Sequence, residues 1–185
     1  MKTADVIIVG SGASGLFNAL FLPQDYKVIV ITKKEVEESD SFLAQGGISA
    51  LKNPEDYDSY FEDTMKAGHY ENDKGAVEKM IKESPQIIQD LKDFGVRFDL
   101  KDGEIEFTRE GGHSTFRILH HEDLTGKEIT SHLYEEAKKR DNITIMENCT
   151  MIDIIEKDGE CKGIVYKDAD GNFDTIEAPD TVLAT

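Results

Sequence analysis

The sequence predicts an α/β fold in which helices flank a parallel β-sheet, and three observations support this prediction. A buried-type strand pattern over 5–9 is followed directly by a glycine-rich turn and a helix-compatible stretch, 14–22. A second apolar run, 27–32, completes a strand–helix–strand unit within about thirty residues. Further along, a helical pattern over 125–140 precedes another strand pattern over 143–147.

The turn after the first strand has the spacing G-x-G-x-x-G, formed by Gly10, Gly12 and Gly15. Gly10 permits a tight turn, and Gly12 has no Cβ that would keep a pyrophosphate away from the backbone. Gly15 allows the helix to pack close to the strand. The free N–H groups and partial positive charge at the helix N-terminus favour phosphate binding. The motif therefore predicts a dinucleotide site in a Rossmann-like fold.

One long connection and two helical patterns follow the second strand. Residues 33–50 are rich in polar and small residues, and a loop of this length is usually functional. Apolar residues recur at helical spacing in two later stretches, and we expect both sets to pack in the core. The first set is Tyr57, Tyr60, Phe61, Thr64 and Met65, and the second is Val77, Met80, Ile81, Ile87, Ile88, Leu91 and Phe94, with Gly95 at the expected helix end.

The last third of the chain predicts a capped helix and a small antiparallel β-meander. Thr125 and Glu128 have the spacing of a capping box at the start of the helix. Residues 151–178 contain two or three short strands, with turns at Asp158-Gly159 and Asp170-Gly171.

Composition excludes several classes of function. The 185 residues include 21 Lys and Arg against 38 Asp and Glu, a net charge of −17, so we expect no nucleic-acid partner. No run approaches the roughly 18 apolar residues of a membrane span, and polar residues such as Asp5 interrupt the N-terminal apolar stretch. We therefore expect a cytoplasmic protein without a membrane partner. Cys149 and Cys161 stand apart in the sequence and are expected to be reduced.

The residues after the second strand bear on the identity of the nucleotide. An NAD site of this kind usually has an acidic residue about twenty residues after the glycines, where it binds the ribose hydroxyls. Here the strand ends in Thr32-Lys33-Lys34, and the first acidic residue is Glu35. This argues against NAD, whereas a lysine at this place suits the additional phosphate of NADP, which stays an alternative.

Two further motifs resemble a known family. A-Q-G-G at 44–47, together with the glycine turn, resembles the flavoprotein subunits of the succinate dehydrogenase and fumarate reductase superfamily. The block R-E-G-G-H-S at 109–114, with R-I-L-H at 117–120 and D-L-T-G at 123–126, narrows this to the L-aspartate oxidase family. The resemblance covers essentially the whole chain. The strand pattern at 180–185 has no turn or cap after it, so we expect a fragment of a longer protein.

The resemblance implies an enzyme that holds FAD and oxidises L-aspartate to iminoaspartate, with oxygen or fumarate as the electron acceptor. This is the first step of quinolinate and NAD biosynthesis, and quinolinate synthase would be a pathway neighbour. Residues 1–185 would be the N-terminal part of an FAD-binding domain, truncated before the capping domain and a C-terminal helical domain. The main catalytic residues would lie beyond Thr185, so we expect none within this sequence and no turnover by it alone.

The resemblance also implies cofactor contacts. These are Gly10, Ser11, Gly12, Ala13, Ser14 and Gly15 in the glycine turn, Lys33 near the adenosine ribose, Asp40, Ser41, Phe42, Leu43, Ala44, Gln45, Gly46 and Gly47 along the flavin, and Thr150 and Met151 at the adenine end. Respiratory relatives have, at the position of Asp40, a histidine that bonds covalently to the flavin. A carboxylate does not supply that bond, so we expect non-covalent FAD.

The substrate side of the expected site has four candidate residues. The carboxylate of Glu110 is suited to pair with the ammonium group of aspartate, and a solvated loop glutamate is the alternative. Arg109, His113 and Arg117 are further candidates for contact with substrate carboxylates or the polar edge of the flavin. The adjacent histidines at 120–121 rarely reach one ion together, so we expect no metal site.

Two other interpretations stay open. One is a soluble fumarate reductase-type flavoprotein of the same superfamily, against which the R-E-G-G-H-S block and Asp40 argue. The other is a non-catalytic nucleotide-binding module, against which the strand pattern at 180–185 argues.

Overall fold

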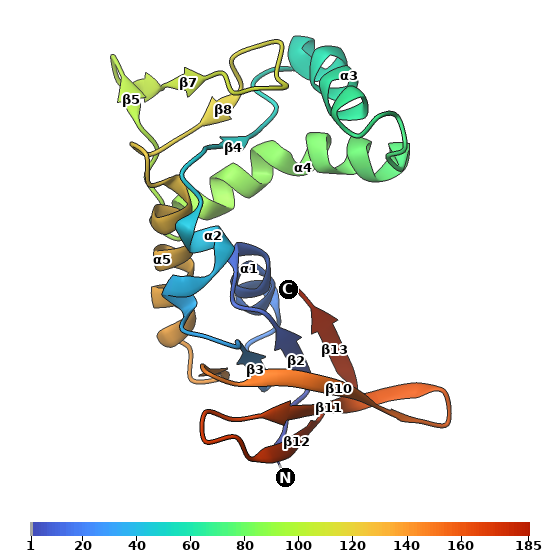
Figure 1. Cartoon of the computed structure of the whole chain (residues 1–185). Helices are drawn as coiled ribbons and strands as arrows, with labels where there is room; N and C mark the ends of the chain where they lie inside the picture. Colours follow the sequence, from blue (N-terminus) through green and yellow to red (C-terminus); the bar gives the residue numbers. More distant parts are fainter. Residues whose placement is uncertain (1) are drawn as a thin grey trace. The chain divides into compact units, whose positions relative to one another are not determined.

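The computed structural model describes residues 2–185, which form two compact units (Figure 1). Residues 2–43 and 129–185 make up the first unit, and residues 44–128 make up the second. The helices are α1 (Ala13–Phe21), α2 (Asp40–Leu43), α3 (Tyr57–Ala67), α4 (Lys74–Asp93) and α5 (Thr125–Lys138), with 3-10 turns η1 (Val36–Glu38) and η2 (Pro54–Asp56). None of the helices within residues 2–185 is long and apolar enough to cross a membrane.

Within residues 2–185 the strands fall into four small sheets. They are β1 (Lys2–Thr3), β2 (Val6–Val9), β3 (Val28–Ile31), β4 (Ile48–Ser49), β5 (Leu100–Lys101), β6 (Glu104–Ile105), β7 (Phe107–Thr108), β8 (Ile118–Leu119), β9 (Ile143–Met146), β10 (Thr150–Lys157), β11 (Glu160–Lys167), β12 (Phe173–Glu177) and β13 (Asp180–Leu183).

The first unit is built around a parallel sheet with the strand order β13-β2-β3-β9. Each neighbouring pair is parallel, with Val182 opposite Ile8 and Val6 opposite Val28 as examples of the register. Every residue of β2 and β3 is buried, because parallel strands of this kind are covered on both faces. Since α1 connects β2 to β3, the predicted βαβ unit and the α/β fold class are confirmed.

β10, β11 and β12 form the predicted antiparallel meander, and β1 joins it parallel to β12. β10 and β11 have eight residues each, so they are longer than the short strands expected. Asp158 and Gly159 both have positive φ in the turn between them, as a tight hairpin turn requires. Tyr166 and Ile176 of the meander share one buried cluster with Ile7 of the parallel sheet.

α3 and α4 form the core of the second unit. Tyr60, Met65, Val77 and Ile81 pack together, as their helical spacing predicts. Met80, which we expected in this core, is 47% exposed. The buried stripe of α4 advances by three or four residues at a time from Val77 through Ile81, and position 80 lies beside this stripe.

The second unit also contains two pieces of sheet that the sequence pattern does not predict. β4, β8 and β7 form a three-stranded antiparallel sheet, and β5 pairs with β6 in a hairpin. Each of these strands has only two residues. A two-residue strand has no measurable alternation of apolar and polar side chains, so periodicity cannot reveal it.

The residues of the expected capping box have other partners. Thr125 Oγ1 accepts a hydrogen bond from the backbone N–H of His121, at 3.0 Å. The Glu128 carboxylate accepts one from the backbone N–H of Arg97, also at 3.0 Å. Both side chains therefore satisfy N–H groups of neighbouring loops, which compete with the helix's own N–H groups for these acceptors.

Gly163 provides a test of the meander. Its φ is +139°, and a Cβ there would collide with the carbonyl oxygen of Ile176 on β12. We expect Gly163→Ala to lower the free energy of unfolding more than Gly159→Ala does. A Cβ on Gly159 would meet open space, so Gly159→Ala should cost only the about 1–2 kcal/mol of a left-handed backbone conformation. Urea unfolding of the full-length protein measures both losses. Equal losses would contradict the close approach of β11 and β12.

Candidate functional site

A cavity of about 740 Å³ opens at the carboxyl ends of the parallel strands of the first unit. Four segments line it: the glycine turn after β2, the connection after β3, residues 149–151 after β9, and the end of β13. Open parallel sheets bind their ligands at this edge, and the volume lies in the range of ligand pockets. The topology therefore indicates a binding site for a small molecule or cofactor.

The glycines of the turn each lie close to a neighbouring segment. Gly10 has a φ of +112°, and a Cβ on it would collide with the carbonyl oxygen of Ala184 at the end of β13. A Cβ on Gly15 would collide with the carbonyl oxygen of Gly10. A Cβ on Gly12 would lie 2.8 Å from the Oγ of Ser41. Positions 10 and 15 therefore need glycine, because a Cβ there would meet backbone, whereas at position 12 the Ser41 side chain would have to move.

Ser11 leaves an unpaired polar atom at the wall of the cavity. Its side chain is 2% exposed, and its Oγ has no hydrogen-bond partner within residues 2–185. α1 begins beside it with Gly12 as N-cap, without a side-chain cap and without an acidic residue in its first turn. A buried hydroxyl without a partner and the free N–H groups of a helix N-terminus together suit an anionic group such as a pyrophosphate.

Glu147 anchors the connection that follows β3. Its Oε1 accepts the backbone N–H of Val36 at 2.9 Å and the hydroxyl of Tyr134 at 3.4 Å. Burial raises the pKa of Tyr134, and the nearby negative charge of Glu147 raises it further. This carboxylate thus ties the end of β9 to the segment that carries Lys33 and Asp40. In the sequence, Glu147 could have been found as a site residue because it ends the predicted strand 143–147.

The structure brings together part of the predicted cofactor set. The predicted residues that line the cavity are Gly10, Ser11, Gly12, Ser14, Lys33, Asp40, Ser41, Thr150 and Met151. Ala13, Gly15, Phe42 and Leu43 belong to the same unit but do not line it, and residues 44–47 belong to the second unit. Sequence reasoning missed Lys34, Glu35, Glu38, Cys149, Ala184 and Thr185, although several follow the ends of predicted strands.

A buried ionic network organises the R-E-G-G-H-S region of the second unit. Arg117 is completely buried, and its Nε and Nη2 donate to the two carboxylate oxygens of Asp56 at 2.8 and 2.9 Å. Its Nη1 donates to Asp63 at 2.7 Å, and Nη2 also donates to the hydroxyl of Ser59 at 2.8 Å. The guanidinium lies over the ring of Tyr60, 4.8 Å from its centre. A buried cation needs partners of this kind to offset its desolvation.

This network shifts the acidity of both carboxyl groups. Hydrogen bonds from Arg117 lower the pKa of Asp56 to about 2, against the opposing effect of burial. For Asp63, burial favours the neutral form, but hydrogen bonds from Ser114 and Arg117 outweigh it and lower the pKa. Both carboxylates are therefore ionised at neutral pH, and they outnumber the single positive charge of Arg117 by one.

The predicted substrate residues occupy different environments. Arg109 and Glu110 are exposed, and the guanidinium of Arg109 lies 5.6 Å from the centre of the Phe116 ring. His113 is half-buried, and its Nδ1 lies 3.0 Å from Nη1 of Arg117. We expected Arg117 to contact the substrate. In the structure its guanidinium donates to Asp56, Asp63 and Ser59 within the protein.

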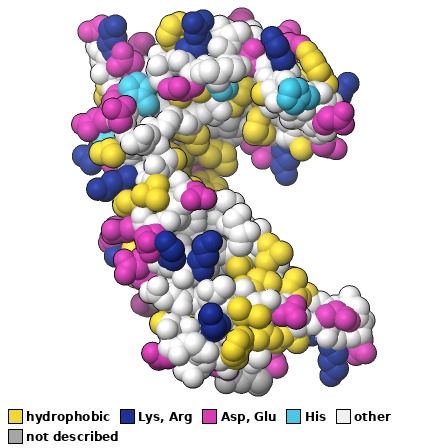
Figure 2. Space-filling view, viewed as in Figure 1, with side chains coloured by type: hydrophobic (Ala, Val, Ile, Leu, Met, Phe, Trp, Pro, Cys, Tyr) yellow, Lys and Arg dark blue, Asp and Glu magenta, His cyan; other side chains and the backbone are white. Residues whose placement is uncertain are grey.

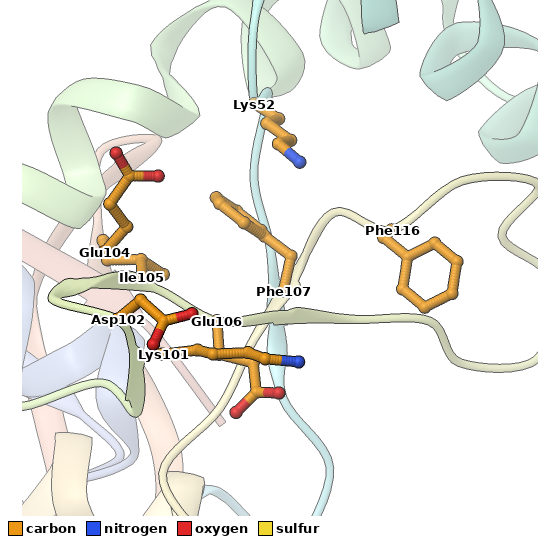
Figure 3. Close-up of a pocket in the computed structure, with 8 residues that line it drawn as sticks. All are labelled: Lys52, Lys101, Asp102, Glu104, Ile105, Glu106, Phe107 and Phe116. Atoms are coloured by element: carbon orange, nitrogen blue, oxygen red, sulfur yellow. The ribbon is translucent and has the colours of Figure 1, made fainter.

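The second unit has two further features outside the predicted site. A cavity of about 580 Å³ is lined by Lys52, Phe107 and Phe116 among others, and Figure 3 shows its lining residues. The Nδ1 atoms of the histidines at 120–121 each lie 3.2 Å from Asp99. Among residues 2–185 no cluster of three or more His, Cys, Asp or Glu side chains is arranged to hold a metal ion.

Comparisons with known proteins identify relatives of the whole chain. The L-aspartate oxidase of Clostridium perfringens is 42% identical over 184 residues, which is 100% of this chain and 42% of that protein. The L-aspartate oxidase of Clostridium acetobutylicum is 46% identical over 160 residues, which is 86% of this chain and 37% of that protein. The chain thus spans less than half the length of these relatives.

Solved structures also match this chain along its whole length. The E. coli quinol fumarate reductase FrdA superposes with a TM-score of 0.93 at 26% identity, covering 100% of this chain and 33% of that chain. The Mycobacterium smegmatis Sdh1 complex in the apo form gives 0.88 at 30% identity, covering 100% and 34%. The family described as "FAD binding domain" matches residues 5–185. The chain belongs to this FAD binding domain family, and its cofactor is FAD.

Proposed function

We propose that the protein oxidises L-aspartate to iminoaspartate, with FAD as the redox cofactor and oxygen or fumarate as the electron acceptor. The observation that carries this proposal is the 42–46% identity to L-aspartate oxidases over 184 and 160 residues. The reaction would open the synthesis of quinolinate and NAD, with quinolinate synthase as the next enzyme.

In this proposal the cavity of the first unit holds FAD without a covalent bond. Ser11 and the N-terminus of α1 bind the pyrophosphate, Lys33 lies near the adenosine ribose, and Thr150 and Met151 contact the adenine end. The segment 40–47 lines the flavin. When bound, FAD supplies the hydride acceptor for oxidation of the substrate C–N bond. The orphaned Ser11 hydroxyl and the uncapped helix support this assignment.

In this proposal, residues of the second unit bind the substrate. Glu110 is exposed on the loop next to His113, and its carboxylate would bind the substrate ammonium group. The remaining substrate-binding groups would come from the capping domain and other segments outside residues 1–185. We therefore propose that this part of the chain holds the cofactor but turns over no substrate alone.

A fumarate reductase-type flavoprotein is the second candidate. The TM-score of 0.93 to the E. coli quinol fumarate reductase FrdA favours it. The lower sequence identity of 26%, compared with 42–46% to the L-aspartate oxidases, favours the first candidate.

Aspartate turnover by the FAD-loaded full-length protein separates the two candidates. We expect aspartate-dependent consumption of oxygen or fumarate. We also expect Glu110→Gln to lower kcat/KM for aspartate roughly tenfold to hundredfold, since a hydrogen bond to a charged group is lost. Glu104→Gln, an exposed acid on β6, serves as the matched control and should have no effect. Fumarate reduction by an external donor, without aspartate oxidation, would favour the second candidate.

Ser11→Ala is expected to have opposite effects on stability and on cofactor binding. It removes a buried hydroxyl without a partner, so the FAD-free protein should keep or gain stability, by about 1 kcal/mol. FAD affinity should fall roughly fivefold, because one hydrogen bond to the pyrophosphate is lost. Thr130→Val also removes a buried, unpartnered hydroxyl, but outside the cavity, and should leave FAD affinity unchanged. A flavin fluorescence titration measures affinity, and equal FAD affinities for Ser11→Ala and the wild type would refute the assignment.

Acid precipitation of the FAD-loaded protein tests the mode of attachment. Because Asp40 stands where the flavin-linked histidine of respiratory relatives is expected, all of the flavin should appear in the supernatant. Yellow, fluorescent flavin retained in the washed precipitate would show a covalent bond.

A further inference from the structure

His113 makes a hydrogen bond that fixes the position of its ring proton. Its Nδ1 lies 3.0 Å from Nη1 of Arg117. A guanidinium group has only N–H donors and does not lose its proton in proteins, so Nδ1 must be the acceptor. An imidazole that accepts at Nδ1 is neutral and has its hydrogen on Nε2. The contact with Arg117 therefore selects one tautomer of His113.

Arg117 is held too firmly to release this contact easily. Asp56 binds it through two parallel hydrogen bonds, and Asp63 binds it through a third. The side chain is completely buried, and it forms ion pairs with both carboxylates. Turning the guanidinium away from His113 would leave buried charges without partners, which is costly.

The backbone around His113 is fixed by the same network. Asp63 accepts hydrogen bonds from both the backbone N–H and the hydroxyl of Ser114, at 2.7 and 2.8 Å. The backbone N–H of His113 donates to the carbonyl oxygen of Glu110 at 3.2 Å. The imidazole also meets the ring of Tyr60 edge-on, with 6.1 Å between the ring centres. The ring thus has both its orientation and its tautomer set before any ligand binds.

The Nε2–H group of His113 is left without a protein partner. Among the described residues, the only hydrogen bond of the ring is the one to Arg117 through Nδ1, and the side chain is half-buried. We propose that this Nε2–H donates a hydrogen bond to a carboxylate oxygen of the dicarboxylic substrate, and that Arg117 is the positioning residue that aims it. This inference rests on the proposed oxidation of aspartate.

Two isosteric substitutions separate this role from a purely structural one. The side-chain amide of Gln reaches the place of Nε2 and can replace the donor, whereas the shorter amide of Asn reaches only the place of Nδ1. We expect His113→Asn to raise KM for aspartate roughly tenfold to hundredfold with kcat little changed, and His113→Gln to stay within about threefold of the wild type. If His113 served only as a partner of Arg117, Asn would be the better replacement, and this reversed order would overturn the proposal.

The tautomer is measured separately, by ¹⁵N NMR of the histidine rings in the substrate-free, FAD-loaded full-length protein. The His113 signal, assigned by its loss in His113→Gln, should show hydrogen on Nε2 and none on Nδ1. Arg117→Lys keeps a positive charge between Asp56 and Asp63, and should allow the Nδ1–H form to appear. Hydrogen on Nδ1 in the wild type, or an unchanged spectrum in Arg117→Lys, would overturn the role of Arg117. Absence of aspartate turnover by the wild type would instead refute the proposed function, and the spectrum would still report on the tautomer.

Discussion

The close approach of backbone segments around Gly10 is the constraint on which the first unit depends. The carbonyl oxygen of Ala184 lies where a Cβ of Gly10 would be, and the carbonyl oxygen of Gly10 lies where a Cβ of Gly15 would be. These contacts bring the ends of β2 and β13 and the start of α1 together at one edge of the sheet. The cavity is the space left beside them, and Ser11 and the uncapped N-terminus of α1 border it because no side chain fills that edge.

The sequence predicted those elements of the fold whose side chains report on burial. β2 and β3 are continuous apolar runs because both faces of each strand are covered, and α4 shows a stripe because one face is. The two-residue strands β4 to β8 leave no such pattern, so the small sheet of the second unit escaped prediction. Thr125 and Glu128 have the spacing of a capping box, but spacing does not show that the backbone N–H groups of His121 and Arg97 also donate to them.

The same limit applies to the candidate site. The glycine turn was predictable, because the spacing of its glycines follows from the local geometry of the strand, the turn and the helix. Glu147 was not, because it acts on Val36 from 111 residues away in sequence. Arg117 looked in the sequence like another anion-binding side chain, whereas its partner Asp56 is 61 residues away. Only the folded arrangement shows that Arg117 binds two carboxylates, and that its further hydrogen bonds go to Ser59 and to the ring of His113.

The net charge of residues 1–185 bears on why an imidazole N–H donor would help to bind the proposed substrate. Residues 1–185 have a net charge of −17, and the field of that charge would oppose the approach of the anionic dicarboxylate that we propose as substrate. Physiological salt screens that field beyond about 8 Å, and acidic and basic side chains are intermingled on the face shown in Figure 2. Binding of the proposed substrate would therefore depend on groups within hydrogen-bonding distance of it. A neutral imidazole oriented by a buried guanidinium meets this need, because its N–H requires no reorganisation and costs less to desolvate than a free cation would.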